Sequence, residues 1–514
     1  MTKSNNFSTI WVAMVVSLGG FLFGFDASVI SGVIKYIKPE FGLDPIELGW
    51  VVSAPTFSAM FAMLVAGPIS DFIGRKKVLI GVAFLYLISA LWSAYAGGYT
   101  DLVIARMLGG IAFGAALVLA PVYIAEIAPA EQRGRLVSIQ QLNIVLGFSA
   151  AYFSNYWLQG ALEGSNWLTE ANIWRWMFGM ECFPAFIYFF ALFFIPRSPR
   201  WLISTGKVEA AKPILARFYG AANAAQELSN ITQSINESEG QPKARLAALF
   251  DWRLSFVLLV GLLLGILQQI TGVNAIYFYA TSIFEQSGVG SNAAFAQAVW
   301  VGIINVVFTL VAMAFIDKMG RKPLLLIGLA GIAISMGITS YGFNQATYML
   351  DANKLPAIEN LTKEQLEPIV GQTFQNDVLF KNALKANLSK EIIDQHEGAF
   401  IEAAIEMNPI IVLIGILGFV ASFAISLGPV MWVMLSEMFP NRVRGIAISV
   451  IGFVNSFTSW LVQFIFPWEL ANWGNAITYL TYALFAVLGF VVMWRLLPET
   501  KGKSLEELEK ELIR

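Results

Sequence analysis

Long apolar runs are the feature of this sequence that most constrains its fold. A helix that crosses a membrane needs roughly 20 predominantly apolar residues, and such runs recur along the whole chain. They lie near residues 10–33, 50–70, 78–97, 103–125, 136–157, 174–196, 254–283, 295–316, 323–343, 409–436, 445–467 and 474–497. Charged residues make up only 13% of the chain, against about 25% in soluble domains. The sequence therefore predicts an all-α polytopic membrane protein with twelve transmembrane helices.

Two short motifs occur twice, in the same order, in the two halves of the chain. The pattern DxxGRK appears at 71–76 and 317–322, and ExxPxxxRG appears at 126–134 and 437–445. Two independent doublets indicate a duplicated unit, and a long repeat in an apolar chain is typical of two membrane bundles. The predicted parts are a six-helix bundle over 1–196, a cytoplasmic linker with short helices over 197–252, a second six-helix bundle over 253–497, an extracytoplasmic insertion of helices over 344–408 and a cytoplasmic tail over 498–514.

Basic residues predict which ends of the helices face the cytoplasm. Lys and Arg are enriched in cytoplasmic loops, and with the N-terminus inside, the short outer loops contain only Lys35 and Lys38. Both termini are therefore expected in the cytoplasm, in a multi-pass protein of the cytoplasmic membrane surrounded by lipid. The first apolar run has no clear cleavage site, so we expect it to remain as the first helix.

Several classes of function receive no support from the sequence. The net charge is −2 and Cys182 is the single cysteine, so neither nucleic-acid binding nor a disulfide framework is indicated. His396 lies among Glu391, Asp394 and Glu397, but one histidine is better explained as a solvated surface residue than as a metal ligand. No nucleophile with a base, phosphate loop or metal cluster stands out, so we expect no enzyme, no cofactor and no metal site.

The charges of the repeated motifs are candidates for a gate. Glycine permits a tight turn between two helices, which would hold the charged residues at the inner edge of the membrane. They could pair with charges on neighbouring helix ends and separate when the protein opens inward; ordinary positive-inside anchoring is the alternative. The inner-gate candidates are Asp71, Arg75, Glu126 and Arg133 in the first half, and Asp317, Arg321, Glu437 and Arg444 in the second.

Asp26 is the most informative ionisable residue, because the surrounding sequence FLFGFDASV places it inside a membrane helix. Such an acid is a functional candidate by default. Helix rise places Asp26 and Glu181 about 10 Å from the outer helix ends and Arg106 about 5 Å, so all three can share one pocket. A neighbouring arginine favours the carboxylate and burial favours the neutral acid. A pair that separates during a cycle can therefore bind and release a proton; a static salt bridge is the alternative.

Along nearly all its length except the insertion, the chain resembles the sugar porter branch of the major facilitator superfamily. The resemblance rests on ten stretches: GGFLFGFDASVISG (19–32), DFIGRKK (71–77), RMLGG (106–110), the two ExxPxxxRG motifs, PRSPRWL (196–202), QQITGVNAIYFY (268–279), DKMGRKP (317–323), GPVMW (428–432) and PETKGKSLEEL (498–508). It implies the major facilitator fold and transport of a monosaccharide by alternating access, which bacterial members often couple to protons. It also assigns the coupling role to Asp26 with Arg106.

The resemblance further implies a sugar site near the bilayer midplane between the bundles. Its contacts would fall on Gln141, Gln268, Gln269, Asn274, Asn305 and Asn455, with Trp432 against the sugar ring. Amides in apolar spans are costly unless paired, and sugar hydroxyls need both donors and acceptors. The alternative for these amides is hydrogen bonding between helices alone.

Some positions depart from the pattern of the family's proton–xylose symporters. Phe148 and Asn455 replace glutamines, Ser456 replaces a tryptophan and Phe278 replaces a tyrosine. These changes make a hexose at least as suitable as xylose. Arg197 stands where the family usually has glutamate, so an inner-gate contact of that acid is expected to be missing or reversed.

The function predicted from these observations is import of a monosaccharide, either a hexose or a pentose, together with a proton. The protein is expected to function as a monomer. A facilitated-diffusion uniporter is the first alternative. A transporter-like sugar sensor is the second, although the 17-residue tail PETKGKSLEELEKELIR is shorter than a signalling extension would require.

Overall fold

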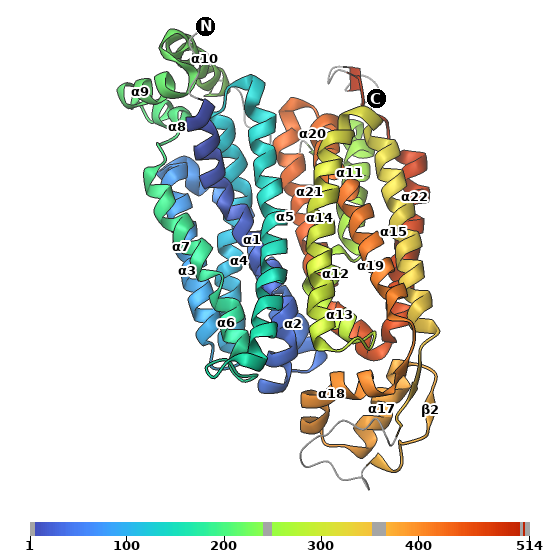
Figure 1. Ribbon diagram of the computed structural model, residues 1–514. Helices are drawn as coiled ribbons and strands as arrows, with labels where there is room; N and C mark the ends of the chain where they lie inside the picture. The colour runs from blue at the N-terminus through green and yellow to red at the C-terminus, as the bar shows by residue number, and fades with distance from the viewer. Residues whose placement is uncertain (1–5, 240–248, 352–365, 504–506, 509–514) are drawn as a thin grey trace. The chain divides into compact units, whose positions relative to one another are not determined.

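The computed structural model describes residues 6–239, 249–351, 366–503 and 507–508. Within them, 12 helical spans are long and apolar enough to cross a membrane (Figure 1), which confirms the predicted fold class. The helices before residue 240 are α1 (Asn6–Glu40), α2 (Pro45–Ile73), α3 (Arg75–Tyr95), α4 (Tyr99–Ile127), α5 (Ala130–Ala161), η1 (Leu162–Gly164), α6 (Ile173–Gly179), α7 (Cys182–Ala191), η2 (Leu192–Phe194), α8 (Pro199–Ser204), α9 (Val208–Tyr219) and α10 (Ala221–Glu239). Those after residue 250 are η4 (Trp252–Leu254), α11 (Ser255–Ile270), α12 (Val273–Phe278), α13 (Ala280–Glu285), α14 (Ser291–Met319), α15 (Arg321–Asn344), α17 (Asp377–Asn387), α18 (Lys390–Ala404), α19 (Pro409–Ile425), α20 (Leu427–Met438), α21 (Asn441–Asn472) and α22 (Gly474–Leu496).

The chain forms two compact units, and four helices contribute to both. Unit 1 comprises Met1–Asp26, Ala54–Phe148 and Phe178–Arg245, and unit 2 comprises Ala27–Ser53, Ser149–Met177 and Leu246–Arg514. Helices α1, α2, α5 and α6 therefore each give one part to unit 1 and the other part to unit 2.

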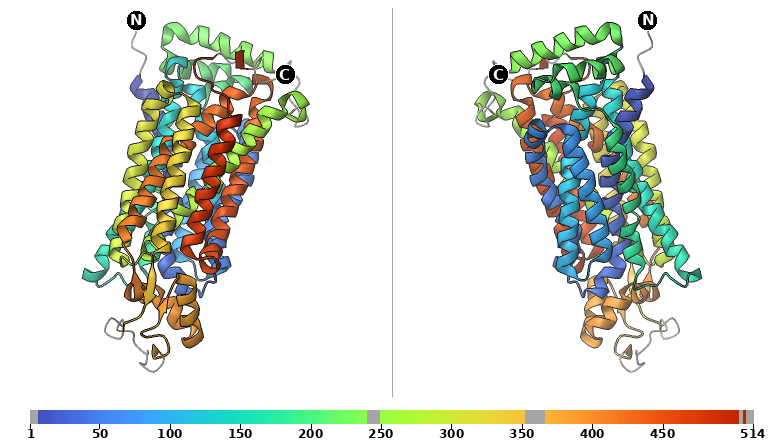
Figure 2. Two further views of the ribbon diagram at one scale, coloured as in Figure 1. Left: turned by 90° about the vertical axis from the view of Figure 1, so that its right-hand side faces the viewer. Right: turned by 90° about the vertical axis from the view of Figure 1, so that its left-hand side faces the viewer.

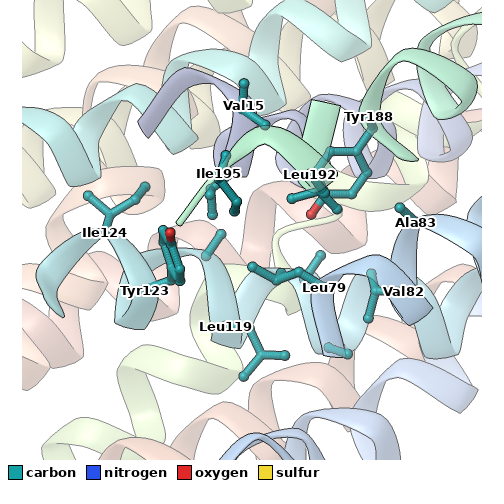
Figure 3. Packing of buried hydrophobic residues seen from close by; sticks show 14 of the residues in the cluster. Val15, Leu79, Val82, Ala83, Leu119, Tyr123, Ile124, Tyr188, Leu192 and Ile195 are labelled. Atoms are coloured by element: carbon teal, nitrogen blue, oxygen red, sulfur yellow. The ribbon is translucent and has the colours of Figure 1, made fainter. Parts of the chain in front are cut away.

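A cluster of buried apolar side chains forms the core of unit 1. Figure 3 shows Leu79 of α3, Leu119 of α4 and Leu192 of η2 among its members. Phe218 of α9 belongs to the same cluster, so the linker helix is held by burial of its own side chain against the bundle. The linker also has a small core of its own around Trp201 of α8. The Ser198 hydroxyl caps the start of this helix by accepting from the backbone N–H of Trp201.

Each copy of DxxGRK forms the turn that joins two membrane helices, as predicted. Gly74 lies between α2 and α3 with φ 97°, and Gly320 lies between α14 and α15 with φ 95°. This left-handed backbone favours glycine, so the turn depends on the motif's own residue. We call the end of each unit that carries its motif the motif end.

Two of the predicted spans in unit 2 are broken helices. The apolar run 254–283 is interrupted at Gly272, whose φ of 91° ends α11 and starts α12, and a Cβ there would lie 2.7 Å from the ring of Tyr482. The run 409–436 is interrupted at Ser426, between α19 and α20. Each run still corresponds to one membrane span, Trp252–Phe278 and Pro409–Met438. Composition gave no sign of the breaks, because it reports burial rather than backbone continuity.

The insertion folds around its own core and contains a sheet as well as the expected helices. Strands β1 (Thr347–Met349), β2 (Thr373–Phe374) and β3 (Ile405–Glu406) form an antiparallel sheet of order β2-β1-β3. Tyr348 of β1 and Phe380 of α17 stack in the core at 5.5 Å between ring centroids. The orange helices in both views of Figure 2 lie beyond the end of unit 2 that is opposite its motif end. His396 on α18 is half-buried rather than fully solvated.

Polar contacts attach the insertion to the membrane helices of unit 2. Asp377 accepts from the Asn475 side chain at 2.8 Å and from its backbone N–H at 3.2 Å, at the start of α22. Glu397 of α18 pairs with Lys38 at the end of α1 and with Lys381 of α17 at 3.2 Å. The insertion is therefore connected to both α1 and α22.

Candidate functional site

Three ionisable side chains lie together inside unit 1. Asp26 of α1, Arg106 of α4 and Glu181 before α7 are all buried. The Arg106 guanidinium donates to the Asp26 carboxylate at 3.3 Å, and the charge of Glu181 acts on both. The guanidinium also lies 5.5 Å from the ring centroid of Phe178. The arrangement holds two acids around one permanent cation, so their proton content depends on how closely each approaches it.

A network of buried amides lies in unit 2, where α11, α12 and α21 meet. Gln269 donates to Asn455 and to Gln268, each at 3.3 Å. Asn274 donates to the Gln269 side-chain oxygen at 2.9 Å, and Asn455 donates to the Gln268 oxygen at 2.9 Å. These four predicted residues are thus brought together. Because each amide has both a donor and an acceptor, the cluster can exchange these mutual bonds for bonds to hydroxyl groups.

Helix breaks position this network. Gly272 ends α11 three residues after Gln269 and lets α12 start in a new direction, which brings Asn274 back beside Gln269. The Gln268 side chain accepts within the network through its oxygen, and its nitrogen donates to the carbonyl oxygen of Leu427 at 3.0 Å, at the start of α20. Discontinuous membrane helices are typical of binding sites in transporters.

The remaining predicted sugar contacts lie outside the network. Asn305 of α14 is buried, and its side-chain amide forms no hydrogen bond with the described residues, so this amide is available to a ligand. Trp432 of α20 is 45% exposed and approaches Gly452 of α21. Gln141 belongs to α5 in unit 1 and is exposed.

Two polar residues that the sequence reasoning missed complete the network. The Asn274 amide donates to the Ser459 hydroxyl at 2.6 Å, and Gln463 donates to the same hydroxyl at 2.8 Å. Asn455, Ser459 and Gln463 follow each other at intervals of four residues on α21. This spacing places polar groups on one face of a helix and was the signal available in the sequence.

Comparison with known proteins decides the family. The chain matches the model of the family "Sugar (and other) transporter" over residues 12–361 and 397–512. It belongs to this sugar transporter family. The gap between the two matched segments lies within the insertion, which is the part of the chain that departs from the family model.

Full-length relatives of the sugar transporter family support this assignment. The chain is 34% identical to the arabinose-proton symporter of Bacillus subtilis, with 100% of this chain and 97% of that protein covered. It is 35% identical to a glucose transport protein of Synechocystis, with 97% and 96% covered. A solved structure of the xylose transporter of E. coli, in a partially occluded inward-open conformation, matches with a TM-score of 0.74 at 31% identity, covering 96% of this chain and 99% of that one.

In this member of the sugar transporter family, the motif charges pair within each half. Arg75 binds Asp71 at 2.5 Å and Glu126 at 3.1 Å. Arg321 binds Glu437 at 2.9 Å, which repeats the Arg75–Glu126 contact.

The other inner-gate candidates have separate surroundings. Arg444 donates to the carbonyl oxygen of Phe439 at 3.0 Å. Arg133, which is exposed, forms a hydrogen bond with Tyr219 of the linker. The side chain of Asp317 lies outside the part of the chain that the structure describes.

Proposed function

We propose that the protein imports a monosaccharide together with a proton across the cytoplasmic membrane by alternating access. Membership of the sugar transporter family supports the substrate class, and a relative named as an arabinose-proton symporter supports the coupling. The observation that carries the proposal is the buried Asp26–Arg106 pair with Glu181 beside it, because an enclosed acid next to a fixed cation can exchange a proton when the pair separates.

In this proposal the amide network is the core of the sugar site. Gln268, Gln269, Asn274 and Asn455 supply donors and acceptors, and the free amide of Asn305 adds another. Gln141 and the ring of Trp432 complete the contacts. Sugar hydroxyls would replace the bonds that the amides now make with one another, so little unpaired polar surface is left in either state.

The motif ends are proposed to face the cytoplasm, together with both termini. The pairs Arg75–Glu126 and Arg321–Glu437 then hold each motif turn in position at the inner edge, and rearrangement of these charges accompanies inward opening. Asp71, Arg133, Asp317 and Arg444 contribute to the same gate. The protein acts as a monomer in lipid.

Uptake of labelled sugars into proteoliposomes tests the proposal. The purified protein is reconstituted and given a panel of pentoses and hexoses, with and without an imposed pH gradient that is acidic outside. At least one sugar is expected to accumulate above its external concentration only when the gradient is present. Equilibration without accumulation would indicate the uniporter, and binding without any uptake would indicate the sensor.

The ion pair between Glu397 of the insertion and Lys38 is predicted to hold the end of α1 against the insertion. Glu397→Gln leaves Lys38 and Lys381 close together without their carboxylate, so the contact should weaken and the buried surface of α1 near Ser31 should open more often. With Ser31→Cys as the probe in a Cys182→Ser background, labelling by a membrane-impermeant maleimide is expected to accelerate by at least roughly fivefold, the factor that about 1 kcal/mol gives.

Glu391→Gln is the matched control, because Glu391 is exposed on the same helix α18. Equal labelling rates in the Glu397→Gln and Glu391→Gln proteins would contradict the prediction. Burial opposes ionisation of Glu397, but the charges and hydrogen bonds of Lys38 and Lys381 outweigh it and hold the pKa of this carboxyl well below its usual range. The pair is lost only as the pH falls through that lowered pKa, so mild external acidity should not change the labelling rate.

A further inference from the structure

The two motif ends differ in the residue that stands beside the first backbone N–H groups of the helix after the motif turn. In unit 2 the carboxylate of Glu499 accepts from the backbone N–H groups of Arg321 and Lys322, each at 3.1 Å. These are the first two residues of α15, and their N–H groups have no partner within the helix. The next residue, Thr500, donates to Glu437 at 2.6 Å. The tail thus supplies an anion to the start of α15.

Unit 1 repeats this arrangement without the anion. Ser198 donates to Glu126 at 2.5 Å, which corresponds to the Thr500–Glu437 contact, so Arg197 occupies the place of Glu499. No described residue accepts from the backbone N–H groups of Arg75 or Lys76 at the start of α3. The copy in unit 2 therefore shows what these backbone groups bind when a partner is present, namely a carboxylate.

A hollow lies at this place in unit 1. Its lining includes four basic residues, Arg75, Lys76, Lys77 and Arg197, with Ser198 and Trp201 beside them; we call it the basic hollow. Charge of one sign gathered at a helix N-terminus, where the helix dipole is also positive, favours an anion.

The positive charge of the basic hollow is only partly compensated. The Arg75 guanidinium is paired with Asp71 and Glu126, and the Lys76 ammonium donates to the carbonyl oxygen of Phe193 at 2.8 Å. Lys77 and Arg197 have no partner among the described residues, and the charge of Arg197 acts on Lys76.

We propose that the basic hollow binds a phosphate-class anion, which takes the place that Glu499 fills in the second half of the chain. A phosphate group offers several acceptor oxygens, enough for the two backbone N–H groups and the side chains of Arg197 and Lys77. The phosphate group comes from free inorganic phosphate or from the headgroup of an anionic lipid. A lipid headgroup can be the source because the motif end lies at the end of a membrane helix. Binding completes the start of α3 and stabilises unit 1.

Thermal unfolding of the purified full-length chain in neutral detergent tests this. Wild type is titrated with inorganic phosphate, against chloride at equal ionic strength, and separately with phosphatidylglycerol. The Tm is expected to rise with the bound anion. Arg197→Glu places a carboxylate where Glu499 stands in unit 2, so its Tm without anion should exceed that of wild type and should not respond to either additive.

Further variants separate the hollow from general charge effects. Lys212→Glu makes the same change of charge on an exposed linker residue whose one ion pair among the described residues is with Glu209, and it should keep the full response. Arg197→Ala keeps the backbone donors but loses the cation, so about tenfold more anion should be needed for half of the Tm rise; this variant serves if Arg197→Glu does not fold.

The outcomes are distinguishable. A response to phosphate assigns the site to the free anion, and a response to phosphatidylglycerol alone assigns it to the lipid headgroup. The proposal is overturned if wild type responds to neither, or if the Arg197 variants respond as wild type does.

Discussion

Asp26→Asn is expected to abolish uphill accumulation of sugar while sugar binding persists. The amide is nearly isosteric with the carboxyl group, and its oxygen can still accept from Arg106, which lies 3.3 Å away in the wild type. It cannot carry a proton through the cycle. With one proton per sugar, a gradient of one pH unit should drive about tenfold accumulation by wild type; in the variant the internal and external concentrations should become equal.

Two measurements isolate the coupling step. Counterflow exchanges labelled for unlabelled sugar without net proton movement, so it should continue at least partly in the Asp26→Asn protein. The external pH should rise when sugar is added to de-energised vesicles with wild type but not with the variant. Alkalinisation that is undiminished in Asp26→Asn would remove Asp26 from the coupling role, and Glu181→Gln would then be examined as the neighbouring acid.

Gln269→Ala and Trp432→Ala are each expected to weaken sugar binding by about 1–3 kcal/mol, or roughly fivefold to 150-fold in Kd. Gln269 is bonded to Gln268, Asn274 and Asn455, so its removal takes away the central donor and acceptor of the proposed site. Trp432 offers an exposed ring on which an apolar sugar face can stack. Equilibrium binding of the sugar that is transported best provides the measurement.

Gln463→Ala distinguishes a lost sugar contact from a disturbed network. Gln463 is bonded to Ser459 at the far end of the same network and is not a predicted sugar contact. Because Gln463 reaches Asn274 only through Ser459, its removal should weaken binding much less than Gln269→Ala does. If Gln463→Ala weakens binding as much as Gln269→Ala does, the amides act by holding helices together, and unchanged affinity in both Gln269→Ala and Trp432→Ala would exclude the proposed site.

Apolar length and repeated motifs were sufficient to predict the spans and the turns. The 12 spans follow from runs long enough to cross a bilayer, and Gly74 and Gly320 were identified because each lies in a charged stretch between two such runs. Asp26 and Glu181 could be placed at one depth, with Arg106 about 5 Å nearer the outer helix ends, because a helix has a fixed rise. These inferences use only properties that act along one helix or at its end.

The features that could not be predicted depend on contacts between distant segments. At the break, Gly272 has a left-handed backbone, and the ring of Tyr482, 210 residues further along the chain, leaves no room for a side chain there. The sheet of the insertion likewise depends on the pairing of Tyr348 with Phe374 and with Ile405. Strands of two or three residues carry too little periodicity to be recognised in a sequence.

The contact of Gln268 with α20 joins α11 and α20, which both carry residues of the proposed sugar site. Gln268 donates to the carbonyl oxygens of Leu427 and Gly428, and Trp432 follows one helical turn later on α20. The side chain that belongs to the amide network therefore also contacts the backbone of α20 one turn before Trp432. In the proposed sugar site we therefore expect the changes in sugar-binding free energy from substitutions at Gln268 and Trp432 not to be additive.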